Sequence, residues 1–202
     1  MGKRIRAAFA AATLVMAVGG STICATSQAK PTQGNTISKE PAVAFRVFGR
    51  AKDERETLVY LWEWAQRFSG MQSLYGADGY NRFPIYMVSK ADLAKTICPE
   101  SPGSCEQMAA VYDTSNPRIL MRKDMDPISN DQDASFLLHE LVHALQGERM
   151  TEDQMYGTCQ RLKKTEDQAY HAQDMFLAMR SDMLQPSHFM RFFLCGKAPM
   201  PS

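Results

Sequence analysis

The spacing of hydrophobic positions predicts helices and short strands after the first fifty residues. Between Asp53 and Phe68, apolar residues recur every three or four positions, which is typical of an amphipathic helix, and Gly70 is placed to end it. Residues 84–88 are a short apolar run that predicts a strand, and a short helix is expected to begin at Ser89. Residues 109–112 and 118–121 predict two more strands, because the segment between them is rich in turn-forming residues.

The C-terminal third predicts two longer helices. Ser129-Asn-Asp-Gln132 resembles a capping box before a helix over 133–146, and Gly147 follows as a stop signal. A second helix is expected from about Gln160 to Leu184. We therefore expect an α+β fold in which a small antiparallel or mixed sheet is covered by helices. One domain should span residues 51–195, followed by a tail over 196–202.

The N-terminus has the pattern of a secretory signal peptide. Basic residues precede an almost wholly apolar run, Ala7 to Val18, and small residues extend to Ala29. The apolar run is too short to cross a bilayer as a mature helix. We expect residues 1–29 to be removed and residues 30–50 to form a flexible leader, and therefore a secreted or periplasmic protein with no transmembrane segment in its mature form.

Composition narrows the class of protein without indicating its chemistry. The chain has 202 residues, of which 45% are hydrophobic and 22% charged, as expected for a soluble domain. The 23 basic and 22 acidic side chains give a net charge of +1, so no charge excess points to nucleic acid as a partner.

Export changes the interpretation of the cysteines. Loss of residues 1–29 would leave Cys98, Cys105, Cys159 and Cys195, an even set in an oxidising compartment. Four cysteines allow three connectivities. The turn-rich loop between Cys98 and Cys105 favours a local bridge there, which pairs Cys159 with Cys195. No C-x-x-C pair is present, so disulfides are favoured over a cysteine zinc site.

The strongest chemical signal is the H-E-x-x-H motif formed by His139, Glu140 and His143. On a helix the two histidines lie about 40° apart, so both imidazoles can face one metal ion. Glu140 is adjacent and can reach a water molecule on that metal. A shuffled chain of this composition would contain roughly 0.004 such motifs, so the motif predicts a metal site.

A third ligand is needed, and Glu166 is the best candidate. It is centred in a mostly apolar stripe of the next helix, where a carboxylate is costly to bury without a cation. The alternative is an internal salt bridge with an arginine. Asp153 is a weaker candidate ligand, only ten residues after His143.

Together, His139-Glu140-x-x-His143 and Glu166-x-x-Ala169 resemble the H-E-x-x-H…E-x-x-A pattern of gluzincin zinc metallopeptidases. Over residues 118–184 the chain is similar to small secreted bacterial gluzincin-like proteins. The resemblance implies a zincin-like fold with the H-E-x-x-H motif on a central helix. It implies that His139, His143 and Glu166 bind one zinc ion per chain and that Glu140 is the general base. It also implies that the strand before this helix, residues 118–121, lines the cleft and pairs with a peptide.

The expected function is hydrolysis of peptide bonds by a zinc-bound water that Glu140 activates. The alternative is a zinc-stabilised, non-catalytic binding or envelope protein on the same scaffold. Glu140 favours the enzyme, because a structural zinc site needs no base. Tyr156, Tyr170 and His188 are all candidates for stabilising the oxyanion, although each tyrosine is also explained as a core residue.

Overall fold

A computed structural model describes residues 46–180, 182, 184–192 and 195. The expected signal peptide, most of the expected leader and the expected tail lie outside these residues. The described part is an α+β structure with one four-stranded mixed sheet. No helix within it is long and apolar enough to span a bilayer.

The sheet has the strand order β1-β2-β4-β3. Strands β2 (Ile85–Val88), β3 (Ala110–Asp113) and β4 (Arg118–Arg122) confirm the three predicted strands. Strand β1 (Arg46–Phe48) pairs antiparallel with β2, β2 runs parallel to β4, and β3 forms an antiparallel hairpin with β4. The expectation of a leader up to residue 50 is therefore wrong for β1, whose three residues are too few to show a strand pattern.

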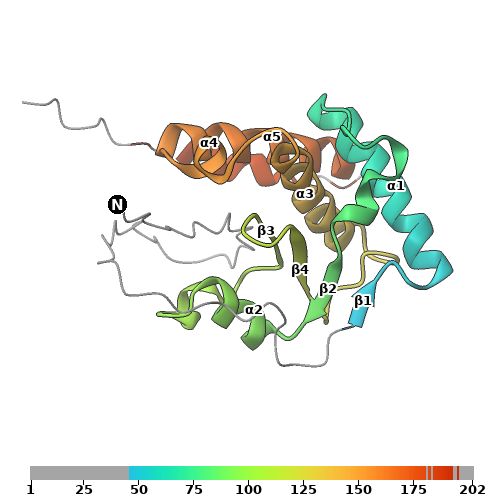
Figure 1. Cartoon of the computed structure of the whole chain (residues 1–202), viewed down its shortest axis with the longest axis horizontal. Coiled ribbons are helices and arrows are strands. Elements are labelled where there is room, and N and C mark those ends of the chain that lie inside the picture. Colours follow the sequence, from blue (N-terminus) through green and yellow to red (C-terminus); the bar gives the residue numbers. More distant parts are fainter. Residues whose placement is uncertain (1–45, 181, 183, 193–194, 196–202) are drawn as a thin grey trace, which may run out of the picture.

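Helices cover both faces of the sheet (Figure 1). On one face, α1 (Lys52–Ser69), α3 (Asp131–Gly147) and α5 (Cys159–Met179) share a core with the inward side chains of the strands, such as Ile119 and Met121. On the other face, α2 (Lys90–Ile97) packs with Val111 and Leu120. The side chains alternate between the two cores because successive strand residues point to opposite faces.

Helix α3 lies at the centre, and every residue from Ala134 to Gln146 is buried. Its N-terminus is capped by Asn130, whose side chain accepts from the backbone N–H groups of Gln132 and Asp133. The predicted cap at Ser129 is wrong by one residue.

Helix α5 ends at Met179, five residues before the predicted end at Leu184. The N–H of Arg180 bonds back to the carbonyl groups of Phe176 and Leu177, a tightened turn that closes the helix. The apolar pattern continues to Leu184, but that residue lies outside the helix and is 48% exposed.

Both predicted disulfides are confirmed. Cys98–Cys105 closes the loop after α2, which contains the short 3-10 helix η2 (Pro102–Cys105). Cys159–Cys195 ties the start of α5 to the chain beyond the 3-10 helix η3 (Pro186–Phe192). The remaining elements are the 3-10 helix η1 (Ala77–Arg82), within the predicted loop over 75–83, and the short helix α4 (Glu152–Tyr156).

Strand β4 is paired on both sides, with β2 and with β3. The expectation that residues 118–121 pair with a peptide is therefore wrong, because backbone groups held in two ladders have no free edge to offer. Strand β3 occupies the sheet edge next to α3 instead.

Candidate metal centre

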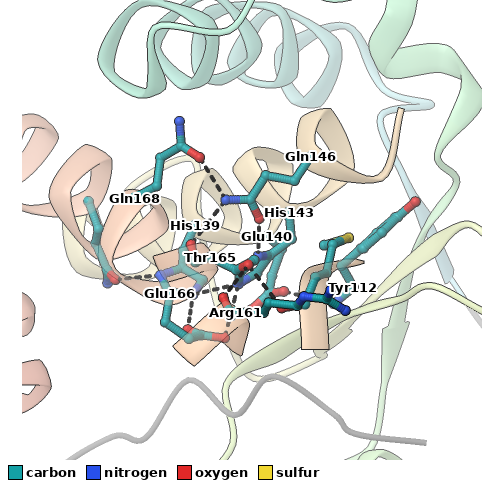
Figure 2. A network of polar contacts seen from close by, with 11 residues as sticks. Tyr112, His139, Glu140, His143, Gln146, Arg161, Thr165, Glu166 and Gln168 are labelled. Atoms are coloured by element: carbon teal, nitrogen blue, oxygen red, sulfur yellow. Dashed lines mark hydrogen bonds and ion pairs between the residues drawn. The ribbon is translucent and has the colours of Figure 1, made fainter. Parts of the chain in front are cut away.

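Helices α3 and α5 bring His139, His143 and Glu166 to one point (Figure 2). The two histidine Nε2 atoms are 3.0 Å apart. Glu166 places its carboxylate oxygens 3.3 Å from Nε2 of His139 and 3.5 Å from Nε2 of His143. All three candidate ligand atoms lie within 4.8 Å of one another, and all three residues are buried, so the group could hold a metal ion.

The pairing of Glu166 decides between the two interpretations of this residue. Its ion pairs are with the two histidines and not with an arginine. Both of its carboxylate oxygens are buried and lack a well-aligned hydrogen-bond donor among the described residues. A buried carboxylate in this position needs a cation, either a proton on an imidazole or a metal.

The pKa values of His143 and Glu166 also indicate that the buried carboxylate needs a positive charge beside it. Burial would lower the pKa of His143, but the neighbouring Glu166 carboxylate raises it to about 9. Burial would raise the pKa of Glu166, but attraction to His143 and His139 lowers it to about 2. Without a metal, a protonated His143 therefore supplies the positive charge beside the Glu166 carboxylate.

The residues fit a transition metal. Two imidazole nitrogens and one carboxylate oxygen are ligands that zinc accepts, and three protein ligands leave a fourth position open. Two of the three candidate ligands are imidazoles and only one is a carboxylate, which disfavours calcium and magnesium because these ions prefer oxygen ligands.

Glu140 is fixed by a contact that the sequence does not reveal. The backbone N–H of Tyr112, on the edge strand β3, donates to Oε2 of Glu140 over 2.7 Å. Glu140 is 0% exposed and adjoins His139 in sequence. The edge strand thus orients the carboxylate beside the metal centre.

Among the candidate oxyanion donors, the structure brings two tyrosines to the histidines. The ring of Tyr170 is 4.5 Å from that of His139, and the ring of Tyr156, from α4, is 6.2 Å from that of His143. His188 is exposed in η3. Asp153 is also exposed and pairs with Arg161 at 2.7 Å, so it does not belong to the metal-ligand group.

Tyr156 has a further property that suits it to this role. Its hydroxyl is buried and has no hydrogen-bond partner among the described residues. Burial, followed by the charges of Glu166 and Glu140, raises the pKa of Tyr156. Its hydroxyl therefore stays protonated and available as a donor.

Gln146 and Gln173 were missed as site residues. Gln146 Oε1 lies 2.8 Å from Nδ1 of His143, and Gln173 Oε1 lies 3.2 Å from Nδ1 of His139. Helical spacing could have found both, because Gln146 follows His143 by three residues and Gln173 shares the stripe of Glu166. No spacing rule could have found the backbone N–H of Tyr112.

The chain belongs to the family described as a domain of unknown function, DUF6647, which matches residues 50–187. This span includes α3, α5 and the entire metal-ligand group. Comparisons with curated proteins and with solved structures found no match.

Proposed function

We propose that the protein is a secreted zinc-dependent metallopeptidase with a gluzincin-type centre on a zincin-like fold. The observation that carries this proposal is the convergence of His139, His143 and Glu166 beside the carboxylate of Glu140. A group able to take a proton next to a three-ligand metal site is the arrangement that metal-assisted hydrolysis requires.

The ligands and the base have separate tasks. When bound, zinc polarises the scissile carbonyl and lowers the pKa of the attacking water. Glu140 accepts the proton of that water and passes it to the nitrogen of the leaving amine, acting first as general base and then as general acid. The N–H of Tyr112 keeps the carboxylate in the orientation for this transfer.

Tyr156 is the residue we assign to the developing oxyanion. Its buried, unpaired hydroxyl lies near His143 and within the field of Glu166 and Glu140. A donor that lacks a ground-state partner can bond to negative charge as it forms on the carbonyl oxygen, without first breaking another bond.

The substrate is proposed to be a peptide or protein outside the cytoplasm. Two disulfides support export, because such bonds persist in oxidising compartments. A cavity of about 160 Å³ lies beside the edge strand β3. Tyr112, which lines this cavity, is also the residue whose N–H contacts Glu140.

One observation favours a second function, a zinc-stabilised protein without catalysis. His139, Glu140 and His143 are each 0% exposed, and Glu166 is only 5% exposed. A site closed to solvent in this way is also what a structural metal centre requires. Glu140 then has no chemical task, which is why we favour the enzyme.

Zinc analysis and a peptide-library digest of the wild type and of Glu140→Gln test the proposal. We expect about one zinc per chain in both proteins and hydrolysis only in the wild type, because the amide cannot accept the proton. Zinc in both proteins with no cleavage by the wild type would support the non-catalytic alternative. Hydrolysis by Glu140→Gln within tenfold of the wild type would show that Glu140 is not the base.

A further inference from the structure

We propose that Gln146 and Gln173 are positioning residues that keep a proton on Nδ1 of both histidines and aim both Nε2 atoms at Glu166. Their use in zinc binding rests on the proposed function, but their geometry does not. Both amides are 0% exposed and each contacts one imidazole. An amide can present either its oxygen or its nitrogen, so its other partners decide which group faces the ring.

The orientation of Gln146 is fixed by acceptors on α5. Its Nε2 donates to the carbonyl oxygen of Thr165 and to Oε1 of Gln168, both over 3.0 Å (Figure 2). A carbonyl oxygen can only accept, and Gln168 uses its own Nε2 to donate to the carbonyl of Ser69. Both acceptors must therefore be contacted by the amide nitrogen of Gln146, which leaves Oε1 to accept from Nδ1 of His143.

Gln173 is fixed in the same way by a serine. Its Nε2 donates over 2.9 Å to Oγ of Ser135. That hydroxyl already donates its proton to the carbonyl of Gln132 over 2.6 Å, so it can only accept from the amide. Gln173 therefore presents Oε1 to Nδ1 of His139.

Each imidazole must then donate from Nδ1, since an amide oxygen offers no proton. In the neutral ring this leaves the lone pair on Nε2, the atom that faces Glu166. Gln146 also bonds to the backbone carbonyl of Thr165, the residue directly before Glu166, so one side chain links a histidine on α3 to the backbone of α5 next to Glu166. The two amides orient the imidazoles without adding negative charge. A divalent ion bound by two neutral imidazoles and one carboxylate would therefore form a group with a net charge of +1.

The test uses Gln146→Met and Gln173→Met, which keep an unbranched side chain but remove the acceptor. In metal-free protein with ¹⁵N-labelled histidine, NMR detects the proton on Nδ1, which both the imidazolium and the required neutral tautomer carry. We expect slowly exchanging Nδ1–H signals from His139 and His143 in the wild type. Gln146→Met should speed the exchange of the His143 Nδ1 proton at least about tenfold, because that proton loses its acceptor, and should spare His139. Gln173→Met should do the reverse, and each variant should raise the zinc Kd about 10- to 100-fold.

Two further variants separate positioning from general damage. Gln173→Glu keeps an acceptor for His139, and the Ser135 hydroxyl can turn to donate to it, so the slowly exchanging Nδ1–H signal of His139 should be retained. Gln66→Met, on α1, removes the side-chain acceptor of the Ser73 backbone N–H, which contacts neither histidine, and should change neither readout.

The inference is overturned if either wild-type histidine lacks the Nδ1 proton, or if both methionine variants leave the two signals unchanged. These signals are recorded without metal. If the wild type binds no zinc, the proposed function fails while the positioning role is still decided.

Discussion

Replacing Glu166 with alanine separates the metal-dependent part of the stability from the rest. Glu166 contributes the only ligand from α5, so a bound ion would cross-link α5 to the histidines of α3. Without metal, the Glu166 carboxylate interacts with a protonated His143, so Glu166→Ala also removes this ion pair. The informative quantity is therefore the increase in stability that zinc produces within each protein.

The expected size of this loss follows from mass action. With zinc at about 1,000 times the wild-type Kd, binding adds about 4.1 kcal/mol to the free energy of unfolding. Losing a group that merely orients a ligand weakens metal binding by up to about 100-fold, so we expect at least that from losing a ligand. The zinc-induced gain should then fall to about 1.4 kcal/mol. The difference of about 2.7 kcal/mol corresponds to roughly 5 to 11 °C in the zinc-induced rise of Tm.

Thermal unfolding with and without zinc measures this difference. Asp153→Ala is the matched control, because Asp153 is the competing acidic residue and its side chain is 79% exposed beside Arg161. The control should keep the full zinc-induced rise. If Glu166→Ala keeps the full rise while Asp153→Ala loses it, the ligand assignment is wrong.

Three other predictions test the oxyanion donor, the protonated state of His143 and the Cys159–Cys195 disulfide. Tyr156→Phe should lower kcat by about 10²- to 10³-fold and leave the zinc Kd unchanged, as measured by steady-state kinetics and zinc titration; unchanged kcat would exclude Tyr156 as the oxyanion donor. Zinc binding at pH 7 should release about one proton, because the pKa of His143 is about 9 without metal, so affinity should rise with pH up to about 9. Calorimetry in buffers of different ionisation enthalpy measures this release, and zero release would contradict it. Cys159→Ser combined with Cys195→Ser should lower the free energy of unfolding by about 4 kcal/mol in denaturant titrations, since that disulfide spans 36 residues; a loss below about 1 kcal/mol would contradict this expectation.

The sign of the His143 effect on stability follows from the same pKa. The folded-state pKa of His143, about 9, lies above the ordinary histidine pKa of 6.5. The protonated pair with Glu166 therefore stabilises metal-free protein fully below pH 6.5, and this contribution is lost as the pH rises to 9.

Local patterns predicted the parts of the site that lie within single helices. The spacing of His139 and His143 requires only one helical turn, and Glu166 was found because a carboxylate interrupts an apolar stripe. The cysteine pairing was also predictable, because the loop between Cys98 and Cys105 is short enough for a local bridge.

The order of the strands could not be predicted, because it depends on contacts between distant segments. Strand β1 pairs with β2 from nearly forty positions earlier in the chain, and this pairing leaves no local pattern. The contact of Glu140 with the backbone of Tyr112 follows from that order, since only an edge strand offers its N–H outward.

Anomalous diffraction at the zinc edge, from crystals of the zinc-loaded protein, tests the central claim most directly. We expect one strong peak between α3 and α5, about 2.0–2.2 Å from Nε2 of His139, Nε2 of His143 and a carboxylate oxygen of Glu166, with no fourth protein ligand. A peak at another group of residues, or no peak in zinc-saturated crystals, would contradict the proposed metal centre.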